Sequence, residues 1–282
     1  MTRKIIEHLS AADPTLGAVI AAAGAFDLGV REERPPFHAL ARAIAHQQLH
    51  AKAAGAILGR MLAHCGGFPE PAALLALADT RLRAMGFSAS KILALKDLAA
   101  KTVAGVVPDR ATLLELDDEA IIARLTEVRG IGRWTVEMLL LFDLRRPDVM
   151  PVDDFGVRNG FKLAYGLRSM PAPRALAAYA ARWAPYRSAA AWFLWRAVDL
   201  HKAGKLPVPT EKVRLPRVVK KRRKRAAKAS AGRKTRTRTG AGTKPRARAT
   251  SAASATPRAR SGARTRARPR PAPRSRAPAK KK

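Results

Sequence analysis

The chain has 282 residues, with 55 Lys or Arg, 21 Asp or Glu and a formal net charge of +34. This length suits one large or two small domains. The single cysteine, Cys65, excludes an internal disulfide, a four-cysteine iron–sulfur cluster and a cysteine-based zinc site. The N-terminus lacks the apolar core of a signal peptide, and no apolar run reaches membrane-spanning length. We therefore expect a cytoplasmic protein that does not bind membranes.

The positive charge is concentrated at one end of the chain. Residues 212–282 hold 28 basic residues and no acidic one, so residues 1–211 carry 27 basic residues against 21 acidic ones. After Val219 the chain is almost entirely Ala, Arg, Lys, Pro, Ser, Thr and Gly, which bury too little apolar surface to offset ordering entropy. Residues 209–282 are therefore predicted to be a disordered tail that binds polyanions by counterion release. The alternative is a tail that only keeps the protein soluble.

Residues 1–208 are predicted to form an all-α core. Apolar residues recur at helical spacing in several segments that Gly or Pro residues separate. These segments are 37–62, 91–103, 119–128, 134–144, 155–165 and 189–200. Helices are expected on both sides of a central motif, which favours two helical lobes. Asp117 or Asp118 is a candidate N-cap for the third segment.

The central motif is a glycine turn between two predicted helices, at about residues 117–143. Gly130 and Gly132 permit backbone conformations that other residues avoid, so two helices can meet there at a sharp turn. The amides of the turn and of the following helix would point outward together as an anion site. Arg129 and Arg133 flank the turn and would add ionic contacts. Taken alone, the pattern is equally compatible with a turn that only packs two helices.

Further blocks accompany this turn in a fixed order. The four blocks are Ile44-Ala45-His46-Gln47-Gln48-Leu49 with Lys52-Ala53-Ala54; Gly86-Phe87-Ser88 with Lys91; the turn at 128–135 with Pro151-Val152-Asp153-Asp154; and Trp183-Ala184-Pro185-Tyr186-Arg187-Ser188 with Trp195. Together they resemble the helix-hairpin-helix DNA glycosylase superfamily and, within it, the DNA-3-methyladenine glycosylase II family. The resemblance spans about residues 35–205, and its most specific part is the third block. It implies a two-lobed helical glycosylase core.

The resemblance implies base excision from double-stranded DNA that contains alkylated bases such as 3-methyladenine. The family's catalytic acid is the second of the aspartate pair, which corresponds to Asp154, and Asp153 would be a cap or support. The dipole of a helix favours a carboxylate in its first turn as the anion. Such an anion stabilises the positive charge that develops on the deoxyribose as the bond to the base breaks, and it can orient water. In the alternative interpretation both acids are only helix caps.

The residue at position 134 distinguishes two mechanisms. Related bifunctional glycosylases carry a lysine in the second helix of the hairpin, where it attacks the sugar and leads to strand cleavage. This chain has Trp134 there, and Arg133 is a poor nucleophile because its guanidinium stays protonated. We therefore expect a monofunctional hydrolase that leaves an abasic site, has no lyase activity and needs no cofactor.

Aromatic residues are expected around the base, which glycosylases rotate out of the duplex. Alkylated purines are cationic, and aromatic faces attract cations. The candidates for the substrate pocket are Trp134, Trp195, Phe155 and Met138. Met138 stands where some relatives have an aromatic residue. Trp183, Trp192 and Phe193 are assigned to the hydrophobic core.

Other residues of these blocks are candidates for contacts with DNA. They are Gln48, Gly130, Ile131, Gly132, Arg133, Arg187 and Ser188. Gln48 would fill the gap left by the rotated base, or else be a buried amide at a helix end. Arg187 and Ser188 would begin the last helix and hold a phosphate, or else only cap that helix.

The sequence also bears on whether the chain binds a metal ion. By family analogy, the carbonyl groups of Thr126, Val128 and Gly130 would hold a monovalent cation. His46 and His50 have no partner at metal-ligand spacing and receive no role.

Some family members carry an additional N-terminal domain of sheet and helix, for which too little sequence precedes the core here. The basic tail, which the family lacks, would supply a non-specific grip on DNA instead.

Two alternative functions stay open. One is a glycosylase for a deaminated or mispaired base, with the same chemistry at the sugar. The other is a non-enzymatic, architectural DNA-binding protein in which the basic tail dominates. The expected protein is in either case a bacterial monomer associated with the nucleoid.

Overall fold

The computed structural model describes residues 2–28, 33–211 and 213–215, so nearly all of the predicted tail at 209–282 lies outside the described residues. The described part is helical and contains no strand, which confirms the predicted all-α class. No helix within it is long and apolar enough to cross a membrane.

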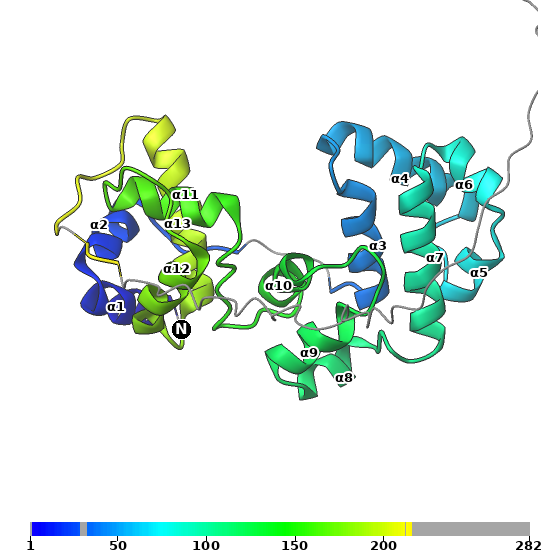
Figure 1. Ribbon diagram of the computed structural model, residues 1–282, viewed down its shortest axis with the longest axis horizontal. Coiled ribbons are helices and arrows are strands. Elements are labelled where there is room, and N and C mark those ends of the chain that lie inside the picture. The colour runs from blue at the N-terminus through cyan, green and yellow to red at the C-terminus, as the bar shows by residue number, and fades with distance from the viewer. Residues whose placement is uncertain (1, 29–32, 212, 216–282) are drawn as a thin grey trace, which may run out of the picture. The chain divides into compact units, whose positions relative to one another are not determined.

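The helices follow one another with short connections (Figure 1). They are α1 (Thr2–Ala12), α2 (Pro14–Ala23), α3 (Pro36–His46), α4 (Ala51–Cys65), α5 (Pro71–Ala76), α6 (Asp79–Met85), α7 (Ala89–Val103), α8 (Arg110–Glu115), α9 (Asp118–Leu125), α10 (Arg133–Phe142), α11 (Phe155–Ala164), α12 (Pro173–Ala180), the 3-10 helix η1 (Ala181–Trp183) and α13 (Arg187–Lys202). Asp117 is the N-cap of α9 and accepts a hydrogen bond from the Ala120 amide at 2.8 Å, as one of the two predicted caps.

Helices α3 to α10 pack around one hydrophobic core and form what we call the hairpin lobe. In this lobe α3 packs against α4, α7 and α10, and α9 packs against α10. Leu40, Ile44, Leu95, Val136 and Leu140 are among its fully buried side chains. The regular helical spacing of these residues is what allows each amphipathic helix to bury one face.

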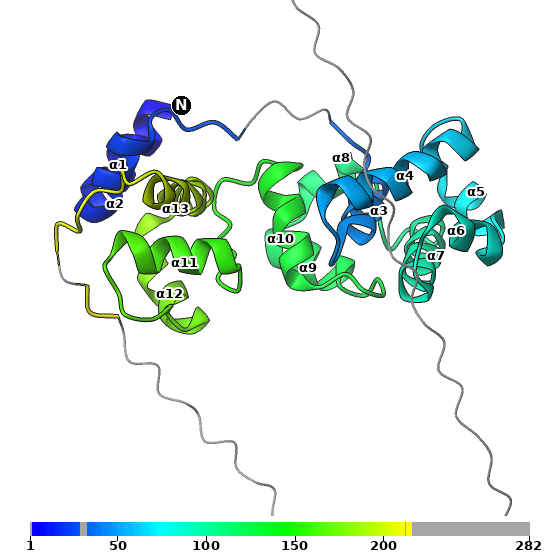
Figure 2. The same ribbon diagram turned by 90° about the horizontal axis from the view of Figure 1, so that it is seen from above.

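The two ends of the described core form a second lobe, the terminal lobe, with its own hydrophobic core (Figure 2). Helix α13 packs against α11 and α2, and α1 packs against α2 and η1. Trp183 and Phe193 are fully buried there, as predicted, whereas Trp192 is half-buried, edge-on to Phe26. Gly160 permits the closest approach, because a Cβ atom there would lie 1.8 Å from the Leu194 carbonyl oxygen.

A buried carboxylate ties the first helices to the rest of the terminal lobe. Asp13 caps α2 by accepting a hydrogen bond from the Leu16 amide, 3.0 Å from its Oδ1. Its Oδ2 accepts hydrogen bonds from Tyr165 (2.6 Å), Tyr179 (3.0 Å) and the indole of Trp183 (3.1 Å). Burial and the neighbouring Asp13 raise the pKa of both tyrosines above the usual value. This network joins residues more than 150 positions apart, and no local sequence pattern predicts it.

One predicted segment is divided in the structure. Residues 37–62 do not form a continuous helix, because α3 ends at His46 and α4 begins at Ala51. In the connecting loop, which we call the 47–50 loop, Gln48 has a left-handed backbone with φ of +57°. A residue other than glycine rarely adopts this conformation, and such strain gathers at functional sites.

Many basic side chains of the hairpin lobe bind backbone carbonyl groups at the ends of helices. The donors and acceptors are Arg60 with Met85, Lys91 with Ala45, Lys96 with Leu75 and Leu77, Lys101 with Glu127, Arg110 with Asp143, Arg124 with Gly105 and Val106, and Arg146 with Leu113, Leu114 and Leu116. These bonds satisfy carbonyl groups that helix geometry leaves without partners. These seven basic side chains therefore stabilise the fold.

Candidate active site

Asp154 stands at the N-cap of α11, directly after the turn that begins at Pro151. Its backbone is extended, and its Oδ1 accepts a hydrogen bond from the Val157 amide at 2.7 Å. This contact satisfies one of the amides that have no partner inside the helix. Asp153 is exposed and is not the cap, so the capping role considered for it belongs to Asp154.

Two tryptophans converge on the Asp154 carboxylate from other helices. The Trp134 indole on α10 donates to Oδ2 at 2.8 Å, and the Trp195 indole on α13 donates to Oδ1 at 2.9 Å. Hydrogen bonds to an ionised group are shorter and stronger than those between neutral groups. All three residues were predicted from the sequence to lie in one site, but the binding of the acid by the indole N–H groups was not.

Close packing fixes the position of Trp195. Its ring stacks on Phe142, with centroids 5.6 Å apart and planes 24° apart. On another side is Gly156, where a Cβ atom would lie 2.7 Å from Cδ1 of Trp195 and 3.1 Å from Oδ1 of Asp154. Gly156 and Phe142 are thus parts of the site that were not predicted from the sequence. Only the position of Gly156, two residues after the acid, pointed to its involvement.

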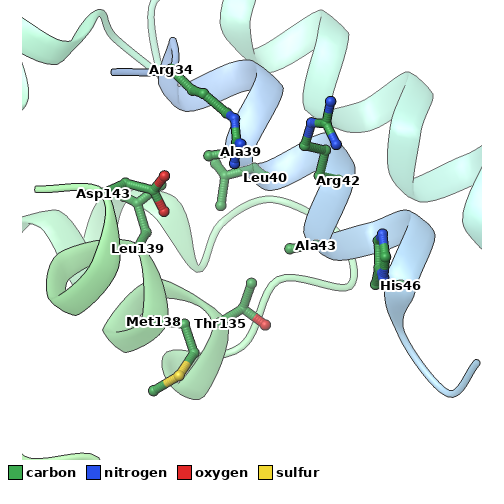
Figure 3. A pocket seen from close by; sticks show the side chains of 10 residues that line it. All are labelled: Arg34, Ala39, Leu40, Arg42, Ala43, His46, Thr135, Met138, Leu139 and Asp143. Atoms are coloured by element: carbon green, nitrogen blue, oxygen red, sulfur yellow. The ribbon is translucent and has the colours of Figure 1, made fainter. Parts of the chain in front are cut away.

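The pocket candidates differ in their exposure and in the surfaces that they line. Phe155 is 68% exposed and Trp134 is 48% exposed, so both present ring surface to solvent. Met138 instead lines a cavity of about 350 Å³ between α3 and α10 (Figure 3). The cavity also has Thr135 on α10 and Arg42 and His46 on α3 in its walls, but not Trp134, Trp195 or Asp154.

The hairpin consists of α9, a tight turn and α10. Gly130 has a φ of +78°, which favours glycine, and the Ile131 amide donates to the Val128 carbonyl at 3.0 Å. Gly132 does not need this freedom, since its φ is −101° and a Cβ atom there would meet nothing within 4 Å. The prediction that both glycines adopt special backbone conformations is therefore wrong for Gly132.

Gly132 matters instead because it leaves the start of α10 open. It is the N-cap of that helix and provides no side-chain cap, so the amides of the first turn lack a side-chain acceptor. Asp97 on α7 holds the turn in place, because its Oδ2 accepts a hydrogen bond from the Arg129 amide at 2.7 Å. Burial opposes ionisation of Asp97, but the bonds from Arg129 and Lys101 bring its pKa below the usual value.

Arg133 is already held by two acids of the hairpin lobe. It binds Glu119 through Nη1 at 2.9 Å and Glu137 through Nε at 3.0 Å. The hydrogen bond from Arg133 lowers the pKa of Glu119, whereas burial raises the pKa of Glu137. A phosphate contact by Arg133 would have to compete with both carboxylates.

The 47–50 loop contacts the hairpin through a neighbour of the predicted plug. Gln47 donates its side-chain amide to the Gly130 carbonyl at 2.9 Å, a contact that the sequence analysis did not anticipate. Gln48 is exposed, which contradicts the alternative that it is a buried amide.

The carbonyl groups predicted to hold a cation are partly occupied. The Gly130 carbonyl accepts a hydrogen bond from Gln47 and the Val128 carbonyl accepts one from the Ile131 amide, and each oxygen keeps a second lone pair. A monovalent cation at these oxygens and Thr126 stays a prediction.

The start of α13 departs from the phosphate-binding prediction. Arg187 and Ser188 do begin this helix. Arg187, however, forms a bidentate ion pair with Asp148, with Nε 2.7 Å from Oδ1 and Nη2 2.8 Å from Oδ2. Ser188 is 3% exposed; its hydroxyl donates to the Arg146 carbonyl and accepts from the Val149 amide. A buried hydroxyl with both partners inside the protein has no surface for a phosphate. These residues fasten α13 to the segment at 146–149 instead.

The sequence of this chain is similar to those of known DNA repair proteins. Residues 41–185 match the family described as HhH-GPD superfamily base excision DNA repair protein. The chain is 44% identical over 171 residues to DNA-3-methyladenine glycosylase 1 of Schizosaccharomyces pombe, covering 60% of this chain and 75% of that protein.

The fold is also similar to those of solved DNA glycosylase structures. The S. pombe 3-methyladenine DNA glycosylase Mag1 in complex with abasic DNA matches with a TM-score of 0.61 and 40% identity, over 68% of this chain and 95% of that one. A DNA-3-methyladenine glycosidase from Bacillus halodurans matches with a TM-score of 0.65 and 33% identity, over 71% of this chain and 91% of that one.

Proposed function

This chain belongs to the HhH-GPD superfamily of base excision DNA repair proteins, and from this premise we propose that it is a DNA glycosylase that removes alkylated purines, chiefly 3-methyladenine, from duplex DNA. The observation that carries the proposal is the Asp154 carboxylate, held at the start of α11 by a backbone amide and two indoles. The similar glycosylases of S. pombe and B. halodurans support the substrate class.

Asp154 would act on the sugar. As the bond between the base and C1′ breaks, positive charge builds on the deoxyribose, and a fixed anion beside it lowers the barrier. Water then adds to C1′ and loses a proton, so the products are the free base and an abasic site. Alkylation at N3 or N7 makes the base a good leaving group, which is why little further activation is needed.

The enzyme would release the base without cutting the strand. Strand cleavage by related glycosylases needs a lysine amine that forms a Schiff base with the sugar. Trp134 on α10, at the position considered for that lysine, has no amine and instead donates to Asp154. Sodium borohydride should therefore trap no covalent adduct between the protein and damaged DNA.

DNA would be gripped at the hairpin and by the basic C-terminal segment. The open first turn of α10 presents amides to a phosphate, with the exposed Gln48 on the neighbouring loop as the plug for the vacated stack. The 28 basic residues of 212–282 would add affinity without sequence preference.

The test is base release from duplex DNA that carries 3-methyladenine, comparing the wild type with Asp154→Asn. We expect the wild type to release the base and the variant to lose at least about 100-fold in single-turnover rate, since it lacks the fixed charge. Equal release by both proteins would reject Asp154 as the catalytic residue. Wild-type release of hypoxanthine or uracil but not of 3-methyladenine would indicate another lesion class. DNA binding without any release would indicate an architectural protein.

A further inference from the structure

The two indoles have a more specific task than forming the walls of a pocket. Resting on the proposed function, we propose that Trp134 and Trp195 are positioning residues that orient the Asp154 carboxylate through their N–H groups. The same geometry assigns Oδ2 as the oxygen that meets the developing sugar cation.

The assignment of Oδ2 follows from the number of lone pairs. Each oxygen of an ionised carboxylate accepts about two hydrogen bonds. Oδ1 of Asp154 already accepts two, from the Val157 amide at 2.7 Å and from Trp195 at 2.9 Å. Oδ2 accepts one, from Trp134 at 2.8 Å. Oδ2, with one donor instead of two, is therefore the less occupied oxygen and the one that we assign to the substrate side.

The donors hold the acid without neutralising it. Among the described residues no ion pair involves Asp154; Arg133 binds Glu119 and Glu137, Arg187 binds Asp148, and Arg158 in α11 donates to the Pro171 carbonyl. An arginine or lysine on Asp154 would cancel much of the negative charge that has to stabilise the sugar cation. Neutral N–H donors fix the direction of the carboxylate and leave its full charge in place.

The two tryptophans differ in how firmly they are held. Trp195 stacks on Phe142 and lies close against Gly156, so its ring has little room to move. Trp134 is 48% exposed and stands in the first turn of α10, beside the amides proposed to bind phosphate. Trp195 therefore fixes the carboxylate within the protein. Trp134 orients the oxygen that faces the substrate and connects it to the DNA-binding hairpin.

The test replaces one N–H group while the shape of the ring is kept. Each tryptophan is exchanged singly, in the full chain, for 3-(3-benzothienyl)alanine, in which sulfur takes the place of the indole N–H. The same exchange at Trp192, which contacts Phe26 and lies outside the site, is the matched control. The probes are single-turnover release of 3-methyladenine and the Kd for duplex DNA that contains an abasic site, measured by fluorescence anisotropy.

We expect the exchange at 134 or 195 to lower the single-turnover rate about tenfold or more, as for the loss of a hydrogen bond to a charged group, with Kd changed less than twofold. The control at 192 should match the wild type in both. An unchanged rate at both 134 and 195 overturns the proposal, as does a rise in Kd that accounts for the whole loss. If the variant at 195 does not fold, the exchange at the exposed position 134 decides the outcome by itself. Failure of the proposed function is seen separately, as a wild type that releases no base.

Discussion

The side-chain amide of Gln47 donates a hydrogen bond to the carbonyl oxygen of Gly130, 2.9 Å away. These residues are 83 positions apart, and the contact joins the 47–50 loop to the turn of the hairpin. The loop carries the proposed plug, Gln48, and the hairpin carries the proposed phosphate site. One hydrogen bond thus couples the loop of the proposed plug to the turn of the proposed phosphate site.

Replacing Gln47 should weaken this coupling. In Gln47→Glu an acceptor oxygen faces the Gly130 carbonyl and repels it, whereas Gln47→Ala only removes the donor. We expect a loss of about 1 kcal/mol in unfolding free energy for Gln47→Ala and more for Gln47→Glu, measured by urea denaturation. Because the plug loop loses its anchor, the single-turnover rate should also fall about fivefold. Gln48→Ala is the control, since Gln48 is exposed and its loss should lower the rate without lowering stability. Equal stability of all three variants and the wild type would contradict the coupling.

Gly132→Ser should separate DNA binding from folding. A serine N-cap would accept a hydrogen bond from an amide in the first turn of α10, and no atom lies within 4 Å of the new Cβ. The helix gains a few tenths of a kcal/mol, so the melting temperature should be unchanged or slightly higher. The same serine oxygen competes with a DNA phosphate for the amide, and the Kd for duplex DNA should rise severalfold. The control is Gly59→Ser on α4, where the new Cβ also meets no atom. Tighter or unchanged DNA binding by Gly132→Ser would mean that these amides do not contact phosphate.

Local sequence patterns predicted much of this molecule. The amphipathic spacing predicted helices and two lobes, Asp117 was one of two candidate caps, and Trp183 and Phe193 were placed in the core. These features depend on residues close together in sequence or on apolar character alone. Two wrong predictions were local, the backbone of Gly132 and the continuous helix over 37–62, whereas the wrong role of Ser188 depended on tertiary partners. Ser188 was expected to face DNA, but the carbonyl and amide groups of a distant segment bury its hydroxyl.

In the candidate active site, too, local contacts could be predicted from the sequence and tertiary contacts could not. An acid at the start of a helix was predicted from Pro151 and the two aspartates, because helix capping depends on neighbouring residues. The indole contacts could not, since Trp134 and Trp195 lie 20 and 41 positions away and their ring orientations depend on packing. The resemblance to glycosylases brought these residues together and suggested that their faces matter. The structure adds that their N–H edges bind the acid.

Gly156→Ala is expected to damage the site with little effect on the fold. The new Cβ would lie 2.7 Å from Cδ1 of Trp195, and Trp195 cannot move away freely because Phe142 stacks against it. We expect the indole to leave Oδ1 of Asp154 and the base-release rate to fall at least tenfold, as for a lost hydrogen bond to a charged group. Gly55→Ala on α4 is the control with the same chemical change, since its Cβ meets no atom and alanine favours the helix. Tryptophan fluorescence of the folded variant should report the displaced ring. A fully active Gly156→Ala enzyme would show that Trp195 need not contact Asp154.

The buried network around Asp13 predicts a loss of stability at alkaline pH. Burial and Asp13 raise the pKa of Tyr165 and Tyr179 in the folded state above the ordinary value of 10. Below about pH 10 both tyrosines are protonated whether the chain is folded or unfolded, and their contribution is fully present. Above that pH the unfolded chain loses these protons while the folded chain retains them, so stability falls as pH rises. The melting temperature should therefore decline steeply above about pH 10.

Tyr165→Phe tests the origin of this decline. The variant should be less stable at neutral pH by about 1–3 kcal/mol, because Asp13 loses its 2.6 Å donor in a buried position. It should also have a shallower alkaline decline, since one of the two shifted groups is gone. Urea denaturation at pH 8 and pH 10.5, with Tyr186→Phe as the control outside the network, measures both effects. An alkaline slope equal to that of the wild type would place the titrating group elsewhere in the protein.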